Sequence, residues 1–196
     1  TMIDLALVWV GIIGLGVLIY VIMDGFDLGI GILFPFIQDH QERDVMMNTV
    51  APVWDGNETW MVLGGAGLFA AFPLVYATVL SALYLPITFM VVALIFRGVA
   101  FEFRFKATRT KHLWDQAFIW GSILSSFFQG VILGAYIQGI ETTNGICSGG
   151  AWDWLTPFSI FTGLGVVVMY ATLGCGWLIW KTEAKLQAHM YQFMPK

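Results

Sequence analysis

The stretch Tyr20–Gly31, YVIMDGFDLGIG, places two carboxylates, Asp24 and Asp27, inside an otherwise apolar run that begins near Leu5. A charged residue at the centre of a membrane helix costs about 2.5–3.5 kcal/mol on insertion scales. Acidic residues in such a position are therefore expected to have a partner or a function.

A second acidic pair follows at the start of the next apolar run, in the stretch Ala51–Trp60, APVWDGNETW. Here Asp55 and Glu58 are three residues apart, the same spacing as in the first pair. Residues at positions i and i+3 share one face of a helix. Each acidic pair is therefore predicted to lie on a single helix face.

The composition indicates a membrane protein. Of 196 residues, 58% are hydrophobic and 11% are charged, whereas soluble domains carry about 25% charged residues. The few basic residues lie in short loops, so no nucleic-acid partner is expected. The chain contains no CxxC or CxxCH motif, which argues against thiol redox chemistry and c-type haem attachment.

Five apolar stretches are long enough to cross a bilayer as helices, which takes about 20 residues. We predict an all-α integral membrane protein whose residues 1–196 form one transmembrane domain. Pro86 is expected to kink the third span, and the segment 181–189 to continue the fifth helix into water. The predicted spans are 5–36, 50–71, 74–101, 114–140 and 157–180.

Lysine and arginine predict the orientation. They occur after the first, third and fifth spans, whereas the turn after the second span and the loop 141–156 contain none. Because basic loops stay in the cytoplasm, we expect the N-terminus outside and the C-terminal tail inside. Both acidic pairs then lie in the cytoplasmic half of the membrane, where Arg97 is the candidate counter-charge.

The four acids allow two interpretations. In one they lie near the interface and are simply solvated or ion-paired. In the other they form a proton relay or ion site facing the bundle interior, as intramembrane acids often do, and the glycines beside them allow helices to approach closely. The candidate proton path is Asp24, Asp27, Asp55 and Glu58, with Trp54, Asn57 and Arg97 as supporting residues.

A metal site is not expected. His40, His112 and His189 all lie outside the predicted spans, so no histidine is available to bind haem at membrane depth. No phosphate-binding loop, hydrolase motif or zinc spacing occurs, and no catalytic residue is assigned.

Four strings resemble subunit II of cytochrome bd-type quinol oxidases, and the cyanide-insensitive branch in particular. They are Met23–Gly31, Asn48–Trp60, Phe69–Pro73 and Phe96–Arg104. The similarity runs through most of the chain.

The resemblance implies a respiratory complex of the bacterial cytoplasmic membrane that oxidises quinol and reduces dioxygen to water. It places haems b and d in subunit I and leaves this subunit without a firmly bound cofactor, although some relatives hold a structural quinone. It implies that this chain supports subunit I and contributes a cytoplasmic proton path, with Asp24 and Asp55 at matching positions. Other expected partners are membrane lipid, quinol through the complex, and a small single-span subunit.

Three matters stay open at this point. Family members have more spans than the five predicted, so the chain is either the N-terminal part of a longer subunit or a shortened natural version. A stand-alone proton- or ion-coupled transporter is the alternative function. A third hypothesis makes the subunit a scaffold, with the acids as assembly salt bridges to Arg97.

Overall fold

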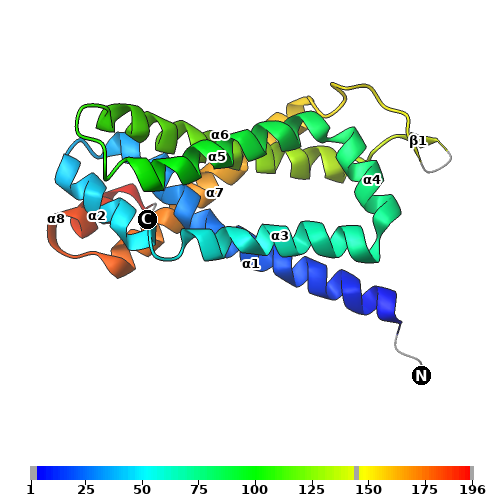
Figure 1. Ribbon diagram of the computed structural model, residues 1–196, viewed down its shortest axis with the longest axis horizontal. Coiled ribbons are helices and arrows are strands. Elements are labelled where there is room, and N and C mark those ends of the chain that lie inside the picture. Colours follow the sequence, from blue (N-terminus) through cyan, green and yellow to red (C-terminus); the bar gives the residue numbers. More distant parts are fainter. Residues whose placement is uncertain (1–3, 144–145, 195–196) are drawn as a thin grey trace.

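The computed structural model describes residues 4–143 and 146–194. Within them the long helices lie side by side in an elongated bundle (Figure 1), with α2 and α8 at one end and α4 and the β-hairpin at the other. The elements are α1 Leu5–Leu33, the 3-10 helix η1 Phe34–Phe36, α2 His40–Val50, α3 Trp54–Ala71, α4 Pro73–Ala82, α5 Tyr84–Phe103, α6 Lys111–Gln138, β1 Thr142–Thr143, β2 Ile146–Cys147, α7 Pro157–Lys181 and α8 Ala184–Phe193.

The predicted class, an all-α membrane protein, is confirmed. In the described part of the chain, four helical segments are long and apolar enough to cross a membrane: Leu5–Phe36, Tyr84–Phe103, Lys111–Gln138 and Pro157–Lys181. The helix α3 has 18 residues and packs along α1 (Figure 1). It begins at Trp54 rather than at 50, because Pro52 lies in the turn that separates it from α2. Its first turns are polar, and its crossing of the membrane stays a prediction.

The third span, predicted as 74–101 with a kink at Pro86, is interrupted more strongly than a kink. The structure divides it into α4 and α5, which meet at a steep angle (Figure 1). The break falls at Leu83, where the backbone leaves the helical region. Pro86 explains its position, because a proline has no amide proton to bond the carbonyl four residues earlier and its ring clashes with that carbonyl. That carbonyl belongs to Ala82, the last residue of α4.

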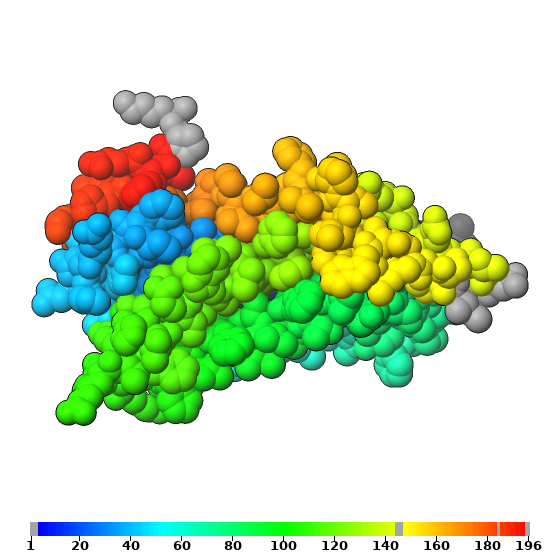
Figure 2. Space-filling model, turned by 90° about the horizontal axis from the view of Figure 1, so that it is seen from above, coloured from blue at the N-terminus to red at the C-terminus, as the bar shows by residue number. Residues whose placement is uncertain are grey.

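The tail does not continue the fifth helix. The chain is extended at Thr182, and α8 then begins as a separate helix. Its apolar residues Leu186 and Met190 are buried in the same cluster as Met46 and Met47 of α2, and the two helices lie together at one end of the molecule (Figure 2). Burial of this apolar face outweighs the expected extension into water.

An ion-pair network joins α2 to the end of α5 and the start of α6. The buried Arg104 bonds Asp115 through Nε and Asp44 through Nη1, the latter at 2.6 Å. Nη1 of Arg43 also lies 3.2 Å from Oδ2 of Asp115, and Nζ of Lys111 lies 2.9 Å from Oδ1 of Asp44. We call these five residues the α2 ion network.

Glycines set the close helix crossings. A Cβ on Gly29 of α1 would lie 2.0 Å from the carbonyl oxygen of Tyr170 and 2.8 Å from the nitrogen of Gly174, both on α7. A Cβ on Gly121 of α6 would lie 2.7 Å from the carbonyl oxygen of Ala93 on α5. Only a residue without a side chain allows backbones to approach this closely, and these crossings hold the helices in register around the polar residues described next.

Candidate functional site

A group of polar side chains lies buried where α1, α3 and α5 meet. Asp24 and Asp27 come from α1, Asn57 and Glu58 from α3, and Arg97 from α5. Asp24, Asp27 and Arg97 are 0% exposed. We call these five residues the acid–arginine cluster.

Arg97 joins the two acidic helices. Its Nη1 lies 2.8 Å from Oδ1 of Asp24, and its Nη2 donates to Oε2 of Glu58 at 2.7 Å. This confirms the predicted counter-charge. The guanidinium also lies 5.7 Å from the ring centre of Trp54, which stacks on Phe101 with 4.8 Å between centroids. Trp54 thus packs within the bundle and covers the arginine, a position in which an aromatic face stabilises a cation.

Asp27 has a neutral partner. Nδ2 of Asn57 donates to Oδ2 of Asp27 at 2.8 Å and approaches the carbonyl oxygen of Met23 at 3.5 Å. The amide holds Asp27 in place but brings no positive charge, so the second carboxylate of α1 relies on Arg97 and on its surroundings for compensation.

Several buried polar atoms of the cluster make no well-aligned hydrogen bond to the described part of the chain. They are both carboxylate oxygens of Asp24, Oδ1 of Asp27, and Nε and Nη1 of Arg97. Asp24 and Arg97 thus form a close ion pair whose hydrogen-bond geometry is poor. Of these atoms only the carboxylate oxygens of Asp24 and Asp27 can accept a proton, since the guanidinium nitrogens of Arg97 are donors.

The four predicted acids differ in burial. Asp55, on the first turn of α3, is exposed. Glu58 follows one turn later with 25% of its side chain exposed, and the two aspartates of α1 are fully buried. The structure therefore brings Asp24, Asp27 and Glu58 together and leaves Asp55 at the surface of the chain.

The sequence interpretation missed a second polar group beside the cluster. Nε2 of Gln129 on α6 donates to the hydroxyl of Tyr20 at 2.7 Å, and the hydroxyl of Tyr170 on α7 donates to Oε1 of Gln129 at 2.7 Å. Two signals were present in the sequence. Tyr20 stands four residues before Asp24, which places both on one helix face, and Gln129 interrupts an apolar helix.

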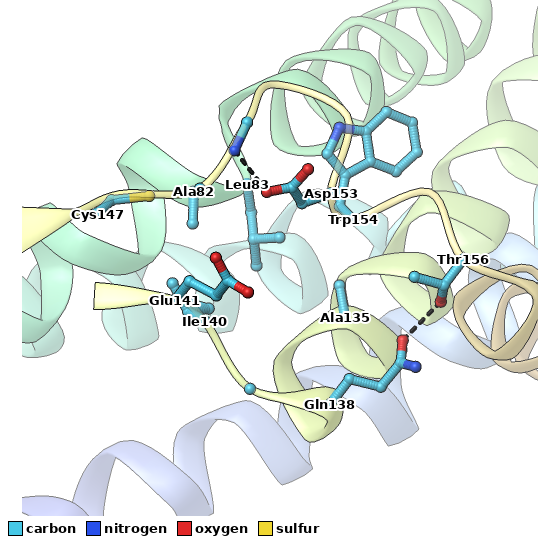
Figure 3. A pocket seen from close by; sticks show the side chains of 13 residues that line it. Ala82, Leu83, Ala135, Gln138, Ile140, Glu141, Cys147, Asp153, Trp154 and Thr156 are labelled. Atoms are coloured by element: carbon cyan, nitrogen blue, oxygen red, sulfur yellow. Dashed lines mark hydrogen bonds between the residues drawn. The ribbon is translucent and has the colours of Figure 1, made fainter. Parts of the chain in front are cut away.

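A pocket of about 180 Å³ lies at the other end of the bundle, between α4, the end of α6 and the loop that follows it (Figure 3). Oδ2 of Asp153 accepts a hydrogen bond from the backbone N–H of Gly150, and the hydroxyl of Thr156 donates to Oε1 of Gln138 at 2.6 Å. These polar side chains hold the loop and the start of α7, so they are already used for structure.

No histidine lies on α1, α3 or α5, the helices that form the acid–arginine cluster. No three His, Cys, Asp or Glu side chains in the described ranges are placed to hold a metal ion. His40 begins α2, His112 lies in the first turn of α6 and His189 lies in α8.

Comparison with known proteins decides the family. The model of the family described as cytochrome bd terminal oxidase subunit II matches residues 5–196. The chain belongs to this family. A subunit II of this family with four candidate spans is a multi-pass protein of the bacterial inner membrane.

Individual relatives agree with the family model. The chain is 34% identical over 190 residues to cytochrome bd-I ubiquinol oxidase subunit 2 of Escherichia coli, an alignment that covers 93% of this chain and 50% of the relative. It is 34% identical over 188 residues to cytochrome bd ubiquinol oxidase subunit 2 of Bacillus subtilis, covering 94% and 55%. A probable cytochrome oxidase subunit 2 of Haemophilus influenzae is 34% identical over 174 residues, covering 85% and 46%. The chain thus spans about half the length of the curated relatives that it matches, and these relatives give no support to the transporter hypothesis.

Proposed function

We propose that this chain is a haem-free subunit of a respiratory quinol:oxygen oxidoreductase, in which it supports the haem-bearing subunit I and contributes a proton path from the cytoplasm. The family and the relatives' names, ubiquinol oxidase subunit 2, support the oxidase. The acid–arginine cluster, buried in an apolar bundle, supports the proton path.

The charge balance of the cluster favours proton transfer. The cluster contains three carboxyl groups, of Asp24, Asp27 and Glu58, and one guanidinium, so a fully ionised cluster would carry two more negative than positive charges. Because uncompensated charge is costly in a low-dielectric interior, the cluster is expected to hold protons and exchange them among its carboxylates. Oδ2 of Asp24 and Oδ1 of Asp27, which accept no hydrogen bond from the described residues, provide the acceptors.

The order of burial supports a direction. Asp55 at the surface can take up a proton, Glu58 lies one helical turn further along α3, and Asp24 lies on the other side of Arg97. With the predicted orientation, Asp55 faces the cytoplasmic half of the membrane. Asp27 and Asn57 then act as a side branch that holds a proton near Asp24.

The cofactors belong to the proposed complex rather than to this chain. Haems b and d are assigned to subunit I, where they supply the electron transfer and oxygen chemistry, as the family resemblance implies. Lipid, quinol reached through the complex, a small single-span subunit and a structural quinone are further candidate partners, to which we assign no residues.

The test is the pair of variants Asp24→Asn and Asp55→Asn, each in the intact, haem-loaded complex. Asparagine preserves the shape of the side chain but carries no exchangeable acid proton, so each variant is expected to lower turnover and proton uptake per haem at least about tenfold. Glu102→Gln, at an exposed carboxylate near the end of α5, is the matched control and should leave both rates unchanged.

Other outcomes identify other roles. If both asparagine variants keep the wild-type turnover and proton uptake, the relay is wrong. If they lower the yield of complex but not the rate per haem, the acids are assembly salt bridges, as the scaffold hypothesis holds. A colourless native assembly, purified without a haem-bearing partner, would contradict the oxidase itself.

A further inference from the structure

The hydrogen-bonded chain of Tyr20, Gln129 and Tyr170 has a defined direction. A phenol has one proton, and Tyr170 uses its proton to donate to Oε1 of Gln129. The amide oxygen therefore faces Tyr170 and the amide nitrogen faces Tyr20, to which it donates. Tyr20 accepts in this bond, so its own proton remains free for another acceptor.

The acceptor that Tyr20 can reach is Asp24. The two residues are one turn apart on the same face of α1, and their side chains interact. Both carboxylate oxygens of Asp24 are buried and lack a well-aligned partner in the described chain. Tyr20 is itself buried, with 5% of its surface exposed, so its hydroxyl does not compete with bulk water.

Tyr170 is the rigidly held end of the hydrogen bonds that link Tyr170, Gln129 and Tyr20. Its ring packs against Gly25, where a Cβ would lie 2.9 Å from two ring carbons, and only 1% of the residue is exposed. A ring held in this way positions its hydroxyl, the hydroxyl orients the Gln129 amide, and the amide directs Tyr20. The bond from Tyr170 thus decides which end of the Gln129 amide faces Tyr20.

We propose that Tyr170 and Gln129 are positioning residues that direct the Tyr20 hydroxyl to donate to the carboxyl group of Asp24. Arg97 contacts this carboxyl group from α5, and Tyr20 adds a neutral donor that stays in place when the carboxyl group gains or loses a proton. Gln129 also ends the relay on this side, because a side-chain amide has no readily exchanged acid proton to pass on.

Infrared difference spectroscopy of the intact, haem-loaded complex tests the contact directly. The carboxyl stretching band that disappears in Asp24→Asn belongs to Asp24. Loss of a hydrogen-bond donor moves a carboxyl C=O stretch to higher frequency, so Tyr20→Phe should shift this band upward. Gln129→Met and Tyr170→Phe should shift it in the same direction but less, because Tyr20 is then present but less well oriented.

Matched controls lie on the same helix as Gln129. Tyr136→Phe and Gln116→Met make the same chemical changes at exposed positions of α6 and should leave the band in place. The proposal is overturned if the Asp24 band keeps its frequency in Tyr20→Phe, or if the controls move it equally.

The kinetic consequence rests on the proposed function of Asp24, whereas the spectroscopic one does not. One lost hydrogen bond corresponds to about a fivefold change in rate. Tyr20→Phe should therefore slow proton uptake about fivefold, and it should have no further effect when combined with Asp24→Asn. If Asp24→Asn itself turns over at the wild-type rate, the proton path fails, while a shifted band in Tyr20→Phe would still support the positioning of Asp24.

Discussion

Arg97 holds two carboxylates that belong to different helices, and this pairing decides what the side chain contributes. It has no exposed surface, and it contacts Asp24 at 2.8 Å and Glu58 at 2.7 Å. A planar guanidinium can bridge two acids, whereas a lysine ammonium acts as a single point charge. The arginine is thus needed for its geometry as well as for its charge.

Arg97→Met should destabilise the complex by about 3–5 kcal/mol, because it leaves buried carboxylates without their cation. The stability of Arg97→Lys should lie between that of Arg97→Met and that of the wild type. Thermal unfolding of the purified complex measures both, with Arg109→Met at an exposed position as the control. A stability of Arg97→Met equal to that of the control would show that the ion pairs contribute nothing.

The α2 ion network predicts acid sensitivity outside the membrane spans. Partial burial acts to raise the pKa of Asp44, but hydrogen bonds from Lys111 and Arg104 outweigh it and lower the pKa below its ordinary value of 3.8. A carboxyl group with a lowered pKa in the folded state stabilises the protein above its unfolded pKa. This contribution is lost as the pH falls below about 4 and through the lowered pKa. Because 36% of the side chain is exposed, we expect less than about 1 kcal/mol.

Asp44→Asn should therefore have a lower free energy of unfolding than the wild type at pH 7. As the pH falls, its free energy of unfolding should decrease less than that of the wild type. Unfolding measured between about pH 2 and 6 compares the two curves, and Glu183→Gln, at an exposed acid, is the control. Parallel curves for Asp44→Asn and the wild type would contradict the assignment.

The crossing of α1 and α7 depends on the absence of side chains at Gly29 and Gly174. A methyl group at Gly29 would lie 2.0 Å from a backbone oxygen of α7, which cannot move aside as a flexible side chain could. The two helices would have to separate, and the faces that carry Asp24 and Tyr170 would separate with them.

Gly29→Ala should therefore destabilise the complex by about 1–3 kcal/mol, the usual range for overpacking. Gly11→Ala provides a control on the same helix, because a Cβ there meets nothing within 4 Å. Thermal unfolding of both variants gives the comparison, and equal midpoints would mean that the crossing adapts without cost.

Hydropathy and spacing predicted the long apolar helices, the acidic pairs and the cation that joins them. They did not predict α2, and they treated the segment of α8 as an extension of the fifth helix into water. The reason is that the apolar residues of both short helices, such as Met46 and Met190, are buried only because the two helices pack together. The bonds of Gln129 to two tyrosines depend on how α1, α6 and α7 cross. The exposure of Asp55 depends on which face of α3 the rest of the bundle covers, and the i,i+3 rule carries no such information.

The two ends of the bundle differ in charge, which gives the whole chain a testable orientation. Arg43, Arg104 and Lys111 gather at the end formed by α2 and α8, while the loop 141–156 has no lysine or arginine. The predicted topology places this loop outside the cell membrane. Cys147 lies in it, partly exposed and unpaired, whereas Cys175 is buried.

A membrane-impermeant maleimide added to intact cells, or to cells whose outer membrane alone is opened, should therefore label Cys147. Cys147→Ser should abolish the signal, which confirms the labelled site. Labelling that requires disruption of the inner membrane would reverse the orientation, and Asp55 would then face the opposite side.

The contact between Asp24 and Arg97 also has a consequence for biosynthesis. The ribosome makes Arg97 about 70 residues after Asp24, which at about 5–20 residues per second takes on the order of ten seconds. During this interval the nascent α1 carries two acids into lipid before their cation exists. Chains stalled before Arg97 emerges should be extracted from membranes by alkaline carbonate more readily than chains stalled after α5. Stable insertion of α1 would then depend on the later synthesis of α5.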